Sequence, residues 1–156
     1  MKGFEDMLRR AVTIRDYLDD IPDGDRAKYD TRRTTYVPNL KALKELRKYS
    51  DLFIVVAIGA TWCKDCAQHM PVLDIISEKT GILAMVLGGV KTDPLNPNRR
   101  WAVPPSPPEV DTLGITRIPT ILVYTKDGVE IGRIIEHPKE TPTIEEELLL
   151  IMDRAS

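Results

Sequence analysis

The sequence predicts an α/β domain, and three observations support this class. Apolar runs without alternation, at residues 52–60 and 82–87, are typical of strands buried on both faces of a sheet. Helix-compatible stretches before and after the first run predict helices over about 39–49 and 64–79. Two shorter apolar runs flank Lys126-Asp127-Gly128 and predict a β-hairpin. Elements that alternate in this way pack as helices on a sheet.

Length and composition indicate a single soluble domain. The chain has 156 residues, of which 42% are hydrophobic and 29% charged, which is enough to bury a core. The formal net charge of −2 argues against a general role in binding nucleic acid or membrane surfaces. The first residues are charged and no apolar run approaches the ~18 residues of a membrane span, so neither a signal peptide nor a span is supported. We therefore expect a cytoplasmic protein with no nucleic-acid or membrane partner.

Residues 1–35 are expected to form a helical extension packed on a domain that comprises residues 36–156. Apolar residues between Phe4 and Leu18 recur at helical spacing, which predicts an amphipathic helix over about 3–19. This helix either covers the surface of the domain or docks a partner. Residues 26–36 are polar and basic without a clear period, so we expect an extended connection there, with a short strand over 34–37 as an option.

The other helices carry signals at their ends or within them. Asn39 can cap a helix through its side chain. Pro71 lies inside the helix that follows the cysteines and predicts a kink, because proline removes a main-chain hydrogen bond. Thr143 and Glu146 fit a capping box, which predicts the start of the C-terminal helix.

Residues 91–108 differ from the rest in composition. Six of the twelve prolines fall between Pro94 and Pro108, beside Arg99-Arg100-Trp101, which predicts polyproline or turn structure. A long loop of this kind is either a packed connection or a contact surface. A short helix is expected over 107–113.

Both cysteines lie in Trp62-Cys63-Lys64-Asp65-Cys66, directly after the first buried strand. This position puts Cys63 at the first turn of a helix, where free N–H groups and the helix dipole favour the thiolate. Cys66 lies one turn deeper, at a Cα separation of roughly 5–6 Å that a disulfide allows. The spacing predicts a redox-active pair in which Cys63 is the nucleophile.

Two other uses of the cysteine pair remain open. A structural disulfide would close a four-residue loop and remove only about 2 kcal/mol of unfolded-state entropy. A zinc site could combine the pair with His69 and His137. On a continuous helix, however, Cys63 and His69 lie about 9 Å apart along the axis, which disfavours a shared ion. The preferred interpretation is therefore a redox pair without a metal, with His69 as a solvated or half-buried helix residue.

A second motif makes the interpretation more specific. Ile118-Pro119-Thr120 leads into the hairpin, and Pro71 lies five residues after the second cysteine. With Trp62-Cys63-Lys64-Asp65-Cys66, these features resemble the thioredoxin family from about Asn39 to the C-terminus. The resemblance implies a thioredoxin-like fold, a central mixed sheet flanked by helices, here with an extra N-terminal helix. It also implies a cis peptide bond before Pro119.

The same resemblance implies a thiol–disulfide oxidoreductase that reduces or exchanges protein disulfides through Cys63 and Cys66. Trp62, Ile118 and Pro119 would form the platform on which the substrate chain lies. No cofactor is expected beyond the Cys63–Cys66 disulfide, and the expected partners are disulfide-containing proteins and an NADPH- or ferredoxin-linked thioredoxin reductase. A glutaredoxin-like enzyme that uses glutathione and a binding module without turnover remain alternatives.

The residues between the cysteines are expected to tune the redox pair. Lys64 favours the Cys63 thiolate, whereas the adjacent Asp65 opposes it. These opposed charges leave open whether the protein acts as a reductase, an oxidase or an isomerase.

Two positions depart from the family pattern. The family usually has a buried acidic residue six positions before the first cysteine, and here that position is Ala57. Glu136 aligns with a family glycine beside the dithiol and is expected either to take the proton of Cys66 or to be an exposed strand-end residue. His137, its neighbour, is expected to point to the opposite side of the sheet.

Overall fold

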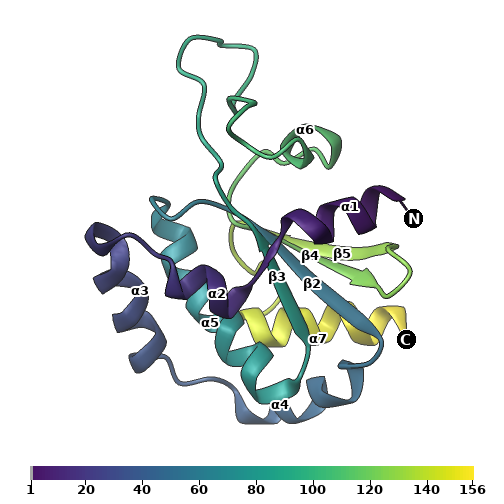
Figure 1. Ribbon diagram of the computed structural model, residues 1–156. Coiled ribbons are helices and arrows are strands. Elements are labelled where there is room, and N and C mark those ends of the chain that lie inside the picture. Colours follow the sequence, from purple (N-terminus) through teal and green to yellow (C-terminus); the bar gives the residue numbers. More distant parts are fainter. Residues whose placement is uncertain (1) are drawn as a thin grey trace.

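A computed structural model describes residues 2–156 and shows a mixed five-stranded sheet with helices around it (Figure 1). The strand order is β1-β3-β2-β4-β5, in which only β2 and β3 are parallel to each other. The predicted fold class is confirmed. The strands are β1 (Val12–Thr13), β2 (Phe53–Ile58), β3 (Leu83–Leu87), β4 (Thr120–Thr125) and β5 (Glu130–Ile135).

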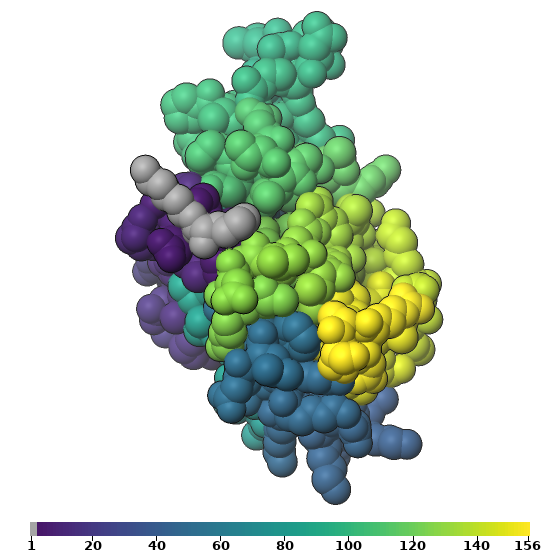
Figure 2. All heavy atoms as spheres, turned by 90° about the vertical axis from the view of Figure 1, so that its right-hand side faces the viewer, coloured from purple at the N-terminus to yellow at the C-terminus, as the bar shows by residue number. Residues whose placement is uncertain are grey.

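The helix that follows the cysteines, α5, contacts α2, α3, α4 and α7, whereas α1 lies beside the β4–β5 hairpin (Figure 2). There the ring centroids of Phe4 and Tyr124 are 4.9 Å apart. None of the described helices has the length and apolarity needed to cross a bilayer. The helices are α1 (Lys2–Arg10), α2 (Ile14–Asp19), α3 (Asp23–Thr35), α4 (Leu40–Leu46), the 3-10 helix η1 (Arg47–Tyr49), α5 (Lys64–Thr80), α6 (Glu109–Thr112) and α7 (Ile144–Ala155).

The elements that lead to the cysteines form as local sequence predicts. Every residue of β2 is buried, in agreement with its uninterrupted apolar run. The Asn39 side chain accepts the N–H of Ala42 at 3.0 Å at the start of α4. At the start of α7, Thr143 accepts the N–H of Glu146 at 3.1 Å. These caps satisfy N–H groups that a helix cannot pair internally.

The N-terminal region departs from the expected single helix over 3–19. Helix α1 ends at Arg10, and Val12 and Thr13 then pair with Val86 and Met85 at the edge of the sheet. The exposed edge of β3 offers unpaired main-chain groups, and pairing with them interrupts the helical pattern. A new helix, α2, follows at once, so the extension is not one amphipathic helix.

The expected extended connection over 26–36, with its optional strand, is also wrong because Asp23–Thr35 form α3. Only Tyr29 is buried along this helix, so the sequence shows no apolar period there. Acidic residues in its first turn and basic residues in its last turn complement the helix dipole. Arg33 also pairs with the buried carboxylate of Asp74 on α5 at 2.9 Å. The boundary between residues 35 and 36 stays a prediction.

The segment between β3 and α6 projects from one end of the sheet (Figure 1). It consists of turns and irregular structure, as its prolines predict, and α6 follows within the expected range. Trp101 anchors its base, since this side chain is buried and donates Nε1–H to the oxygen of Ile115 at 2.6 Å. Leu95, in the projecting part, is 92% exposed.

Candidate functional site

Cys63 occupies the N-cap position of α5, as the motif predicts. Its Sγ accepts the main-chain N–H of Cys66 at 3.3 Å and lies 3.6 Å from the main-chain oxygen of Ile118. Only 8% of the residue is exposed. The strand-to-helix junction therefore brings this thiol against the segment that precedes Pro119.

The surroundings of Cys63 favour its thiolate. A hydrogen bond from the Cys66 thiol, with main-chain N–H groups of Cys66 and Asp65, lowers the pKa of Cys63 to about 7. Burial and the Asp65 carboxylate act in the opposite direction. Lys64 is exposed and makes no hydrogen bond that would hold it near the thiol in the described structure. The hydrogen bond from Cys66, with the main-chain N–H groups at the start of α5, therefore accounts for the lowered pKa of Cys63.

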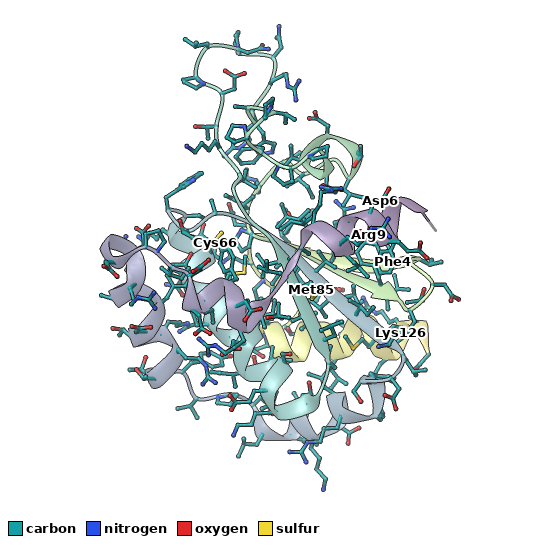
Figure 3. All side chains as sticks on the ribbon, viewed as in Figure 1. Phe4, Asp6, Arg9, Cys66, Met85 and Lys126 are labelled. Carbon is teal, nitrogen blue, oxygen red and sulfur yellow. The ribbon has the colours of Figure 1, made fainter. Side chains whose placement is uncertain are left out.

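Cys66 lies inside the molecule, near the end of the sheet from which the segment 91–108 projects (Figure 3). Its hydrogen bond to Cys63 and its burial raise the pKa of Cys66. Gly59 leaves room for this sulfur: a Cβ at Gly59 would lie 2.8 Å from Cys66 Sγ and 2.9 Å from Met70 Cε. Both cysteines are free thiols. The pair thus combines one thiol of lowered pKa with one of raised pKa.

The three residues expected to receive a substrate chain lie around Cys63. The Ile118–Pro119 peptide bond is cis, as expected. The Pro119 oxygen accepts the N–H of Glu136 at 2.8 Å, which ties this segment to the end of β5. Trp62 is 49% exposed, and its Nε1–H donates to the oxygen of Val90 at 3.0 Å. The role of these residues in substrate binding stays a prediction.

A cavity of about 370 Å³ opens beside Trp62. Its other lining residues, Lys91, Thr92 and Pro94, belong to the projecting segment. The loop that the sequence singled out for its prolines therefore forms part of the surface next to the dithiol.

Three side chains meet beside the dithiol, and we call them the rim cluster: Asp65, Glu136 and His137. One nitrogen or oxygen atom from each lies within 4.8 Å of the others. His137 Nε2 is 3.5 Å from Asp65 Oδ1, and the Glu136 carboxylate is 3.5 Å from the guanidinium of Arg117. The expectation that His137 points to the opposite side of the sheet is wrong. Strand β5 ends at Ile135 and Glu136 adopts a φ of 68°, so side-chain alternation stops before His137.

His69 is buried rather than solvated or half-buried. Its Nε2 lies 2.8 Å from Nδ1 of His137, and burial, assisted by His137, lowers the pKa of His69 to about 4. The sequence held one signal for this location, because Asp65 and His69 are four residues apart on one helix. Neither cysteine is among the clustered ligand atoms of the described residues, which disfavours a zinc site made from both cysteines and both histidines.

The position of the missing family carboxylate, Ala57, is fully buried in β2. Glu136 does not fill that position, since its carboxylate hydrogen-bonds to Arg117. Whether Glu136 accepts the proton of Cys66 stays a prediction.

Two tyrosines from the N-terminal region also approach the dithiol, and sequence reasoning missed both. The hydroxyl of Tyr29 lies 3.3 Å from the oxygen of Ala60 and 3.2 Å from that of Thr61, just before the cysteine motif. The ring of Tyr17 packs where a side chain on Gly88 would otherwise lie. Burial raises the pKa of both tyrosines, and the nearby cysteines add to the effect. No local pattern reveals these contacts, because they join segments far apart in the sequence.

Comparison with solved structures agrees with this fold. A protein of unknown function from Pseudomonas aeruginosa is 14% identical, with 98% of both chains covered and a TM-score of 0.74. An HIV epitope-scaffold is 13% identical, with 98% of this chain and 99% of that chain covered and a TM-score of 0.73. A thioredoxin-fold protein from Helicobacter pylori is 14% identical over 73% of this chain and 82% of its own, with a TM-score of 0.43. At these identities the first two show a shared fold. No curated protein matches the sequence.

The family described as Thioredoxin matches residues 11–87, a span that contains β1 to β3 and both cysteines. The fold and the site define a thioredoxin-like protein with a free dithiol at the start of a helix. Over residues 11–87 the sequence therefore matches the thioredoxin family, and the fold of the described chain agrees with that match.

Proposed function

We propose that this protein is a thiol–disulfide oxidoreductase that reduces, or exchanges, disulfides of protein substrates. The difference between its two thiols is the main support: the pKa of Cys63 is lowered to about 7, whereas that of Cys66 is raised. A thiol with a pKa near neutral combines a substantial thiolate fraction with good nucleophilicity. Cys66, whose pKa is raised, stays protonated until the second step.

In the first step, the Cys63 thiolate attacks one sulfur of a substrate disulfide. A bond forms between Cys63 and that sulfur, the substrate S–S bond breaks, and the other substrate sulfur leaves as a thiolate. The exposure of Trp62, the contact of Ile118 with Cys63 and the cavity beside Trp62 support a substrate chain that lies across these residues.

In the second step, Cys66 loses its proton and attacks Cys63. The Cys63–Cys66 disulfide forms, and the second substrate sulfur leaves and takes up a proton from solvent. Two electrons have then passed from the dithiol to the substrate. The required cofactor is this disulfide alone, and we propose that an NADPH- or ferredoxin-linked thioredoxin reductase restores the dithiol. The proposed compartment is the cytoplasm, where C-x-x-C pairs are more often catalytic than structural.

The test uses insulin as a disulfide substrate, with dithiothreitol as the reductant. The wild-type protein should accelerate reduction, and Cys63→Ser should abolish the acceleration. Reduced Cys66→Ser, mixed with insulin after the dithiothreitol has been removed, should accumulate a mixed disulfide with the substrate. Iodoacetamide should label Cys63 well before Cys66 at neutral pH. A protein that binds substrate but accelerates nothing would be a binding module, and faster labelling of Cys66 would reverse the roles of the two thiols.

A parallel assay identifies the electron donor. The oxidised protein should be reduced by NADPH with a thioredoxin reductase faster than by glutathione. Faster reduction by glutathione would favour the glutaredoxin-like alternative.

A further inference from the structure

The rim cluster has the composition and spacing of a metal site. The redox reaction proposed above requires no metal ion there. It presents one imidazole nitrogen and two carboxylate oxygens within 4.8 Å of one another. Asp65 comes from the start of α5, whereas Glu136 and His137 follow β5. In a tetrahedral site with bonds of about 2.0–2.2 Å, ligand atoms stand roughly 3.3 Å apart, so modest side-chain rotations would bring these three into position.

The second histidine holds His137 in an orientation suited to ligation. Nδ1 of His137 contacts Nε2 of His69 at 2.8 Å, which leaves Nε2 of His137 facing Asp65. Histidines that bind metals commonly donate their other ring N–H to such a partner, which fixes the ring and its tautomer. With the His137 proton on Nδ1, His69 accepts it through Nε2 and carries its own proton on Nδ1. That Nδ1 is buried and has no hydrogen-bond partner among the described residues.

The charges at the rim also favour a cation. Two carboxylates lie close together there, and Arg117, which approaches Glu136 at 3.5 Å, has a side chain that is 61% exposed. An exposed pair of this kind contributes little and can be displaced. Mixed nitrogen and oxygen ligands suit divalent ions such as Zn²⁺, whereas Ca²⁺ and Mg²⁺ prefer oxygen alone.

We propose that Asp65, Glu136 and His137 bind one divalent transition-metal ion, of the class represented by Zn²⁺, with His69 as the positioning residue for His137. Three protein ligands leave one coordination position for water. The ion would link Asp65, at the start of α5, to Glu136 and His137, which follow β5. This site is separate from the thiols, so it can be loaded while the cysteines are disulfide-bonded.

The test is a calorimetric titration of Zn²⁺ into the oxidised full-length protein, whose sulfurs are then unavailable as thiolates. One ion should bind per chain, and the bound protein should unfold at a higher temperature. His137→Ala should abolish binding. Asp127→Asn, which removes an exposed carboxylate from the turn between β4 and β5, should leave it unchanged. Zinc binding only by the reduced protein, or equal binding by wild type and His137→Ala, would overturn the proposal.

A second comparison tests the part assigned to His69. His69→Leu should weaken zinc binding by about 10- to 100-fold, as loss of an outer hydrogen bond does at other metal sites. His69→Gln keeps an acceptor for the N–H of His137 and should recover most of the affinity. Equal zinc affinities for the leucine and glutamine variants would show that His69 does not position His137 by accepting its N–H. If the leucine variant fails to fold, Asp65→Ala supplies the test of the cluster, since this change removes a direct ligand and should abolish binding.

Discussion

The dithiol has two contrasting sides. On the inner side, Cys66 packs beside Gly59, close to Met70. The strand β2 carries Ala57 at the position where the family pattern predicts a carboxylate. On the outer side, the rim cluster brings two carboxylates and a histidine together beside the first turn of α5. One side contains apolar groups at close packing, and the other concentrates charge.

This difference shows how one short motif obtains two unlike thiols. The hydrogen bond from Cys66, with main-chain N–H groups at the helix start, lowers the pKa of Cys63. The same hydrogen bond, together with burial, raises the pKa of Cys66. The position of the family carboxylate is occupied by Ala57, which is buried in β2. Four measurements test whether the inner side determines the stability of the protein and the rim cluster affects only the rate of proton transfer.

The largest expected effect is a pH-dependent difference in stability. Folding lowers the pKa of Cys63 from 9.0 to about 7, so its contribution is complete above pH 9 and is lost as the pH falls through 7. Between these values the reduced wild-type protein should gain about 2 to 3 kcal/mol of unfolding free energy relative to Cys63→Ser. Urea unfolding under reducing conditions measures this gain. Above pH 9 the curve should turn downward, because Cys66 ionises in the unfolded chain but resists ionisation when buried.

Parallel pH profiles for the wild type and Cys63→Ser would show that the start of α5 does not stabilise the thiolate. The oxidised wild-type protein serves as a further control, since it has no thiol to titrate.

Gly59→Ala tests the packing of the inner side. The new Cβ would lie 2.8 Å from Cys66 Sγ, and the required shift should cost about 1 to 3 kcal/mol of unfolding free energy. Urea unfolding of the reduced variant measures the loss. Gly24→Ala is the matched control because, beyond its chain neighbours and the backbone of its own helix, no described atom lies within 4 Å of the added Cβ. The stability of this variant should stay the same or rise by up to about 1 kcal/mol. Equal unfolding free energies for Gly59→Ala and Gly24→Ala would show that Cys66 and Met70 can move to accommodate the added methyl group without a loss of stability.

Tyr29→Phe tests the link between the N-terminal region and the dithiol. It removes the hydroxyl that contacts the oxygens of Ala60 and Thr61, and should lower the unfolding free energy by about 1 kcal/mol. Tyr124→Phe is the control, since the Tyr124 hydroxyl is buried and has no partner among the described residues. That change should be neutral or slightly stabilising. A greater loss for Tyr124→Phe would contradict the assigned contact.

The smallest expected effect is kinetic and lies at the rim. With a metal chelator present, Glu136→Gln should slow the attack of Cys66 on a mixed disulfide severalfold near neutral pH, while the first attack by Cys63 keeps its rate. Single-turnover measurements separate the two steps. Arg117→Gln removes the ion-pair partner of Glu136 and should leave the second step at least as fast. Unchanged rates for both steps in Glu136→Gln would mean that the rim takes no part in this proton transfer.

The sequence by itself determined the features that depend on neighbouring residues. The buried run of β2, the C-x-x-C junction and the caps at Asn39 and Thr143 follow from local patterns and hydrogen bonds within a few residues. The place of Cys63 at a helix start follows for the same reason, because a strand and a helix must meet there.

Tertiary structure decided what depends on distant partners. The predicted first helix is interrupted because Val12 and Thr13 pair with the edge of β3. Helix α3 is held by an ion pair with the Asp74 carboxylate, which a search for apolar periodicity in the sequence does not detect. The rim cluster exists because the chain turns at Glu136 and carries His137 back toward α5. Such contacts join residues tens of positions apart, and their energies appear only after the sheet has brought those residues together.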